Sequence, residues 1–172
     1  MASTDVTRED RNVEMRVLKR SRKAPRAGDV FVFQLHGSEY YFGRVICTSA
    51  RHGSTNNLYL LYFYDTHRLS KLPVPALARD RLLFPPIVAG RELWTSGYLE
   101  TVANVPLQEG DTFSVHCFES APIRPGGRTC YVDEYDNPLE RRYEPCSVRG
   151  MTTIVGVNNR VKRALRLSAE TD

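Results

Sequence analysis

The segment "DVFVFQLHGSEYYFGRVI", residues 29–46, limits the fold more than any other part of the chain. Residues 30–35 follow the period of two that sends successive side chains to opposite faces of a strand. The polar stretch "HGSE" contains Gly37 and Ser38, which favour a turn. "YYFGRVI" then continues with the aromatic and β-branched residues that are common in strands. The segment therefore predicts an aromatic β-hairpin, with most of its rings in the core.

Further strands are expected over most of the chain. Residues 58–65, within "NNLYLLYFYDT", are apolar on both faces, which indicates a central strand. Pro85 and Pro86 cannot donate to a sheet, so the segment around them suits a sheet edge or a crossing segment. The other strand-like stretches are "GYLETVANVPL", "GDTFSVHCFES" and "CYVDEYDNPLERRYE", the last with a turn at residues 136–138.

One helix is expected, close to the C-terminus. Val161, Ala164 and Leu165 have helical spacing, and Asn158 or Asn159 can cap the helix. Many short strands and one late helix predict a mainly β fold, of the β-rich α+β kind. We expect a strongly curved antiparallel sheet or partial barrel with a short C-terminal helix.

The positive charge of the chain is concentrated at its ends. The net charge is +4, and residues 1–28 carry eight basic and four acidic residues. We expect a flexible basic tail at residues 1–18, a single domain at residues 19–167 and a C-terminal tail at residues 168–172. The N-terminal tail is expected to add little to specific binding, because salt screens its charge over about 8 Å. A second basic cluster comprises Arg160, Lys162, Arg163 and Arg166.

The apolar segments are too short for a membrane anchor. The longest uninterrupted apolar run is "LYLLYFY", whereas a spanning helix needs about 20 such residues. Because no signal peptide is recognisable either, a cytoplasmic protein is expected. The cysteines form no CxxC pair, so we expect reduced thiols, no structural disulfide and no metal site. They are Cys47, Cys117, Cys130 and Cys146.

Catalysis is not indicated by any motif. The chain has no G-x-S-x-G elbow and no phosphate-binding loop. His116 adjoins Cys117, but neighbours on a strand point to opposite faces and cannot act as a pair. We therefore expect no enzyme activity, no catalytic residue and no cofactor.

Nucleic-acid binding is the alternative that the residues leave open. The basic tail could contact phosphates, and Tyr40, Tyr41 and Phe42 resemble the aromatic platforms on which bases stack. Alternating aromatics in β domains are more often core and cross-strand pairs. The sequence therefore favours a core role for this hairpin over a β-barrel module that binds nucleic acid.

An acidic cluster, Asp133, Glu134 and Asp136, surrounds Tyr135 in "YVDEYDN". Paired carboxylates can act as general acid and base or bind Mg²⁺. More often they decorate the exposed end of a hairpin. A third role is an interface whose charges imitate phosphates.

The chain resembles the immunity protein 26 family of bacterial polymorphic toxin systems. The resemblance covers about residues 19–167 and is strongest in "KRSRKAPRAGDVF" and "YYFGRVI". The segments "PPIVAG", "SGYLETVANVPL", "YVDEYDNPL" and "GVNNRVKRAL" also resemble it. Leu99 and Asp136 depart from the family pattern, in which we expect Trp and Gly. Asp136 can still serve the turn, because Asp tolerates left-handed backbone.

The resemblance implies an immunity protein that binds and neutralises a cognate bacterial toxin, such as a nuclease, by direct contact and without catalysis. Such a protein needs a stable scaffold and a complementary surface. The expected partner-binding residues are Asp133, Glu134, Tyr135 and Asp136 of the acidic hairpin, with Tyr40 and Tyr41 of the aromatic hairpin.

Overall fold

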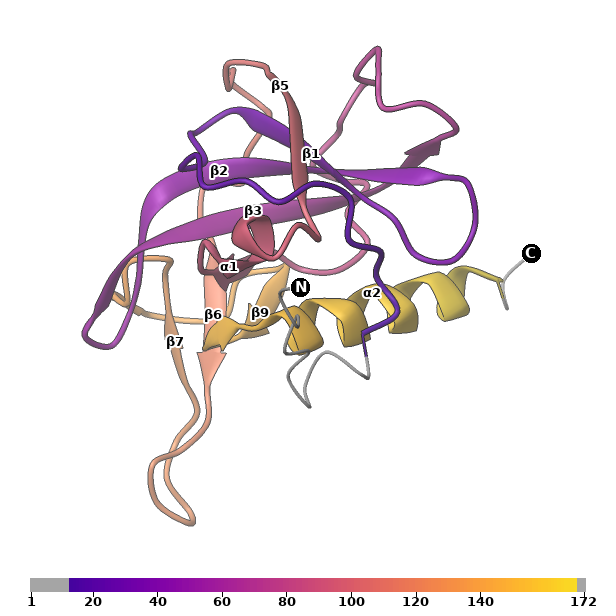
Figure 1. The fold of residues 1–172 in the computed structure, drawn as a ribbon. Coiled ribbons are helices and arrows are strands. Elements are labelled where there is room, and N and C mark those ends of the chain that lie inside the picture. Colours follow the sequence, from indigo (N-terminus) through magenta and orange to yellow (C-terminus); the bar gives the residue numbers. More distant parts are fainter. Residues whose placement is uncertain (1–12, 170–172) are drawn as a thin grey trace, which may run out of the picture.

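The computed structural model describes residues 13–169 and is mainly β, as the sequence predicts (Figure 1). The described part of the molecule consists of two sheets, a one-turn helix and a C-terminal helix. The elements are β1 (Asp29–Phe33), β2 (Tyr40–His52), β3 (Thr55–Arg68), β4 (Ile87–Ala89), α1 (Glu92–Thr95), β5 (Glu100–Asn104), β6 (Cys117–Ser120), β7 (Cys130–Val132), β8 (Pro138–Leu139), β9 (Cys146–Val148), β10 (Met151–Thr152) and α2 (Ile154–Ala169).

The larger sheet has six strands in the order β10-β4-β3-β2-β1-β5. Its strands pair antiparallel except for β10, which runs parallel to β4. The long pair β2–β3 contains four register irregularities, and β-bulges of this kind bend a sheet. Gly43 lies at one of them, where a Cβ atom would meet the Phe31 ring at 2.2 Å. The glycine inside this strand therefore makes room for a core aromatic ring.

The core lies on both faces of this sheet, which confirms the central position predicted for residues 58–65. Phe31, Phe33 and Phe63 face one side, where they pack with Trp94 and with residues of α2. Tyr62 and its neighbours face the other side, against Phe118 of the smaller sheet. Of the aromatic hairpin, Phe31, Phe33 and Phe42 are fully buried. The core role predicted for this hairpin is therefore confirmed.

The smaller sheet has four strands in the order β8-β7-β6-β9. β6 pairs antiparallel with β7 and parallel with β9, and β7 pairs with β8 as predicted. The loop at residues 121–129 extends away from both sheets (Figure 1). Because its strands contain only two to four residues, this sheet depends strongly on side-chain contacts.

Helix α2 begins at Ile154, so the predicted cap at Asn158 or Asn159 is wrong. The Thr153 hydroxyl and carbonyl oxygens instead accept hydrogen bonds from the amides of Gly156 and Val157. Asn158 is fully buried in the helix. Its side-chain oxygen accepts hydrogen bonds from the amides of Glu14 and Met15, at 2.9 and 3.2 Å.

The segment before β1 lies against the domain. Met15 is buried, and the amides of Arg16 and Leu18 donate to the carbonyls of Gln34 and Gly97. Residues 13–18 of the predicted tail therefore contribute to the fold, whereas residues 1–12 lie outside the described residues. The boundaries predicted for the domain and its two tails stay predictions.

Pro85 and Pro86 precede β4 and do not interrupt it. The three residues of β4 pair with β3 on one side and with β10 on the other. The predicted edge position is therefore wrong. Both prolines precede Ile87, the first residue of β4 that pairs with β3. The amide hydrogens that the prolines lack are therefore not needed by the sheet.

Candidate functional site

The acidic hairpin forms the turn between β7 and β8. The Asp133 carboxylate accepts hydrogen bonds from the amides of Tyr135 and Asn137, both at 2.9 Å. Asp136 has a φ of 64°, in the left-handed region that its place in the turn requires. Tyr135 is 39% exposed and is the member of the cluster that faces solvent.

Glu134 belongs to a buried polar chain that joins the two sheets. Its carboxylate lies 3.1 Å from Nδ1 of His116, and Nε2 of His116 lies 2.7 Å from the Tyr62 hydroxyl. That hydroxyl accepts from the Phe113 amide, so its own proton is free to point to His116. Burial raises the pKa of Tyr62 and keeps it protonated. The order carboxylate, imidazole and hydroxyl is also found in hydrolases, but here the hydroxyl belongs to a fully buried tyrosine.

Asp136 is held just as firmly. Its two carboxylate oxygens lie 2.8 and 2.7 Å from the Arg149 guanidinium, and the Gly53 amide donates to one of them at 2.6 Å. The hydrogen bonds from Arg149 lower the pKa of Asp136. The expectation that these carboxylates are exposed and free for a partner is wrong for Glu134 and Asp136, because both are engaged within the chain.

The two predicted tyrosines lie at the other end of β2. Tyr41 stacks on Phe33 with ring centres 5.7 Å apart, and the Lys71 ammonium lies 5.4 Å from the centre of the Tyr40 ring. The acidic hairpin contacts the far end of the strand, where the Arg51 amide donates to the Glu134 carbonyl. At about 3.3 Å per residue the strand separates these ends by tens of ångströms. The structure therefore does not bring the six predicted contact residues together.

A groove that the sequence did not reveal lies between α2 and the segment before β4. It measures about 470 Å³. Leu83, Phe84 and Pro85 contribute apolar lining, and Phe84 packs on Phe63 of the core with ring centres 5.0 Å apart. Arg160 and Arg163 line the groove from the helix. An apolar lining beside two guanidinium groups can bind an acidic and partly apolar segment.

Between residues 13 and 169, no carboxylate balances the charge of this groove. Arg160 is half-buried, and burial followed by the nearby charge of Arg163 lowers its pKa. Among the described residues, neither guanidinium has a carboxylate within ion-pair distance. Lys162, on another side of the helix, is bonded to Glu14. Helical spacing would have placed Arg160 and Arg163 on one face of the helix and Lys162 on another. Nothing in the sequence revealed that Leu83, Phe84 and Pro85 line the groove beside these arginines.

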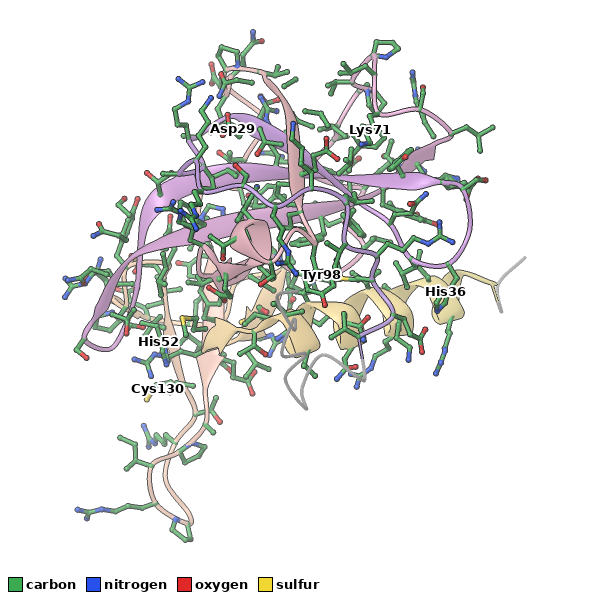
Figure 2. All side chains as sticks on the ribbon, in the orientation of Figure 1. Asp29, His36, His52, Lys71, Tyr98 and Cys130 are labelled. Carbon is green, nitrogen blue, oxygen red and sulfur yellow. The ribbon has the colours of Figure 1, made fainter. Side chains whose placement is uncertain are left out.

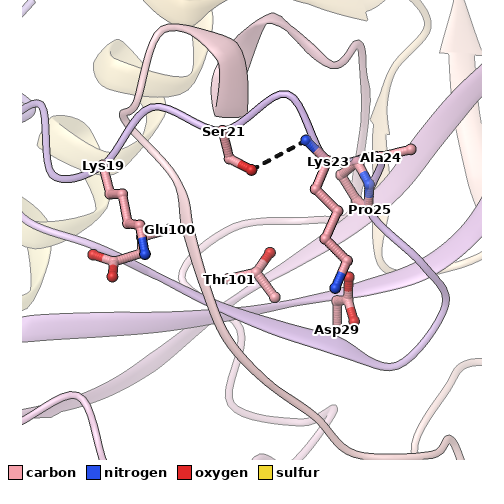
Figure 3. Close-up of a pocket in the computed structure, with 8 residues that line it drawn as sticks. All are labelled: Lys19, Ser21, Lys23, Ala24, Pro25, Asp29, Glu100 and Thr101. Atoms are coloured by element: carbon pink, nitrogen blue, oxygen red, sulfur yellow. Dashed lines mark hydrogen bonds between the residues drawn. The ribbon is translucent and has the colours of Figure 1, made fainter.

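A second cavity, of about 190 Å³, lies between the N-terminal segment and the strands β1 and β5 (Figure 3). Lysine and carboxylate side chains line it together. The Asp29 carboxylate accepts from Asn104, and Glu100 is bonded to Lys71 at 2.7 Å. Both carboxylates of this cavity already have partners within the chain. The groove is therefore the better candidate for binding a charged ligand.

The described part of the chain holds no group of three His, Cys, Asp or Glu side chains that could bind a metal ion. Between residues 13 and 169, no helix is long and apolar enough to cross a bilayer.

Residues 26–126 match the model of the family Immunity protein 26. The chain belongs to this family. The immunity protein 26 match spans β1 to β6 and ends in the projecting loop, so the acidic hairpin, β9 and α2 lie beyond it. No curated protein and no solved structure matches the chain.

Proposed function

We propose that this immunity protein neutralises a cognate toxin by direct contact, without catalysis. Membership of the immunity protein 26 family supports a toxin as the partner. The proposal places the protein in the cytoplasm of a bacterium with a polymorphic toxin system. There it would bind toxin before the toxin reaches its target.

The observation that carries the proposal is an arginine pair beside an apolar lining, for which the described residues supply no carboxylate partner. A half-buried guanidinium without a carboxylate partner is costly, and a carboxylate from another protein would remove that cost. Arginine also binds carboxylates with two parallel hydrogen bonds, which fixes their orientation. We therefore propose that an acidic segment of the toxin, with an apolar side chain, occupies the groove of Arg160, Arg163 and Phe84.

The charge of the groove also bears on the kind of toxin. Many nucleases hold their metal ions with clustered carboxylates. Such a cluster would complement Arg160 and Arg163, and covering it would stop the reaction. The exposed Tyr135 of the acidic hairpin stays a second proposed contact, because exposed tyrosines often anchor interfaces.

Binding to the product of a neighbouring toxin gene tests the proposal. The intact chain is expected to co-purify with that toxin and to rescue cells that express it. Reversing both groove charges, by Arg160→Glu with Arg163→Glu, should raise Kd about 30-fold, since losing the partner of the half-buried Arg160 costs about 2 kcal/mol and the exposed Arg163 adds little.

A matched control changes the net charge equally at another place. Arg22→Glu with Lys23→Glu alters two exposed residues and should leave Kd within a few-fold of the parent value. If both variants lose the same affinity for the toxin, the loss comes from the net charge of the chain and not from the groove. The groove would then no longer be the proposed binding site. If no neighbouring toxin binds the intact chain, direct neutralisation is wrong. Salt-sensitive oligonucleotide binding would then favour the nucleic-acid alternative.

A further inference from the structure

Two buried cysteines lie side by side in the smaller sheet. Cys117 of β6 and Cys146 of β9 are direct partners in the parallel pairing of these strands. Their side chains are 2% and 9% exposed, and the two sulfur atoms lie 2.7 Å apart. Neighbours in adjacent strands have the Cα separation that a disulfide requires. The two thiols could therefore be joined without moving the backbone.

The other two cysteines have no such arrangement. In the sheets Cys47 is opposite Leu60, and Cys130 is opposite Ser120. Cys130 is exposed near the base of the projecting loop (Figure 2). The contact between Cys117 and Cys146 is therefore a particular feature of the β6–β9 pair and no general property of the thiols in this chain.

We propose that Cys117 and Cys146 form a disulfide when the protein meets a low-molecular-weight disulfide such as oxidised glutathione. In the first step the Cys117 sulfur, as a thiolate, attacks one sulfur of the oxidant and releases one thiol. In the second step the Cys146 sulfur attacks Cys117 and releases the second thiol. The protein loses two electrons and two protons, and the oxidant gains them as two thiols.

The surroundings favour this order of attack. The Tyr143 amide donates to the Cys117 sulfur at 3.4 Å, so a hydrogen-bond donor already lies beside the attacking atom. Burial, followed by the hydrogen bond to Cys117, raises the pKa of Cys146 to about 12. Cys146 therefore remains a thiol until Cys117 has reacted. Since both sulfurs are buried, the first attack requires a local opening of the small sheet, and the reaction should be slow.

The bond would link two residues 29 positions apart in the chain. The segment that it closes contains the projecting loop and the acidic hairpin. A covalent link across this segment reduces the freedom of its unfolded states. Oxidation should therefore tie β6 to β9 within the small sheet, and reduction should release this link.

The test uses the full chain with Cys47→Ser and Cys130→Ser, which keeps only the buried pair. The protein is incubated to equilibrium in buffers with increasing ratios of oxidised to reduced glutathione, then alkylated and digested with trypsin. Arg128 and Arg142 lie between the two cysteines and separate them into different peptides. We expect a linked pair of peptides that is lighter by two hydrogen atoms than the separate thiol peptides.

The same variant with Cys117→Ser is the matched control, and it should give no linked peptide. The wild-type chain reports on the oxidant, because exposed Cys130 should acquire glutathione. A buried pair that stays reduced while Cys130 reacts would overturn the proposal. Bonds to Cys47 or Cys130 in place of the buried pair would overturn it too. No toxin takes part in this test, so its result is independent of the proposed function.

Discussion

The two sheets of this immunity protein are stabilised in different ways. The six-stranded sheet has strands of up to 14 residues, and apolar and aromatic side chains cover both of its faces. The four-stranded sheet has strands of two to four residues. Two ion pairs, His116 with Glu134 and Asp136 with Arg149, lie within it. It meets the larger sheet through the hydrogen bond of His116 to Tyr62, the amide of Gly53 on Asp136 and the apolar packing of Phe118.

The family match follows the apolar sheet more closely than the polar one. The match includes β1 to β5 of the larger sheet but only β6 of the smaller. The larger sheet can therefore serve as the scaffold of the family. Arg160, Arg163 and Cys146 of the proposed sites lie beyond the match, whereas Phe84 and Cys117 lie within it.

The largest effect is expected in the apolar sheet. Phe31→Ala removes a fully buried ring that packs edge-on against Phe63 and Trp94. The loss should lower the free energy of unfolding by about 3–5 kcal/mol, measured by urea denaturation. Leu69→Ala, at an exposed position, is the matched control and should change little. A small loss for Phe31→Ala would contradict an apolar origin of this sheet's stability.

The polar link between the sheets should come next. Glu134→Ala leaves Nδ1 of the buried His116 without its carboxylate partner. An unsatisfied buried donor costs about 1–3 kcal/mol, and hydrogen exchange should show the loss mainly in β6 and β7. Uniform destabilisation of both sheets, with no preference for the small one, would argue against separate modes of stabilisation.

Asp136→Asn should cost about 1–2 kcal/mol near neutral pH, because charged hydrogen bonds to Arg149 are lost. The pKa of Asp136 is lowered from its usual 3.8, so its contribution is present above that pH and disappears as the pH falls through the lower value of the folded state. Urea denaturation between pH 7 and pH 2 should show that the variant and the parent converge in acid. If the difference in the free energy of unfolding between variant and parent stays constant over this range, the charged contact with Arg149 is not its cause.

The smallest effect is expected in the projecting loop. Ile123 is 100% exposed, and Ile123→Ala should change the free energy of unfolding by less than about 0.5 kcal/mol. Thermal and urea denaturation measure this directly. A larger loss would mean that the loop packs against the domain, contrary to its position in Figure 1.

The sequence predicted the apolar sheet better than the polar one. The hairpin of β1 and β2 was predictable because alternation and turn residues are local signals. The parallel pairing of β6 with β9 was not, because strands of three or four residues carry no periodic pattern. The start of α2 was missed because Asn158 has the side chain of a cap but binds Glu14 and Met15.

The candidate site was predictable only in part. The basic cluster around Arg160 and Arg163 is visible in the sequence, but its apolar lining comes from a segment about 75 residues earlier, around Phe84. The acidic cluster was recognised by composition alone. Composition could not show that Glu134 and Asp136 find partners within the chain, because those partners lie on other strands and loops.

The hydrogen bonds from Glu14 and Met15 to Asn158 join residues 144 and 143 positions apart. Chains are synthesised from the N-terminus at about 5–20 residues per second. Several seconds or more therefore pass between the synthesis of Glu14 and Met15 and that of Asn158, which accepts their hydrogen bonds. Until then, Met15 lacks the residues of α2 that belong to the same core cluster. Translation therefore sets the earliest moment at which a newly made molecule can become fully folded and able to protect its cell.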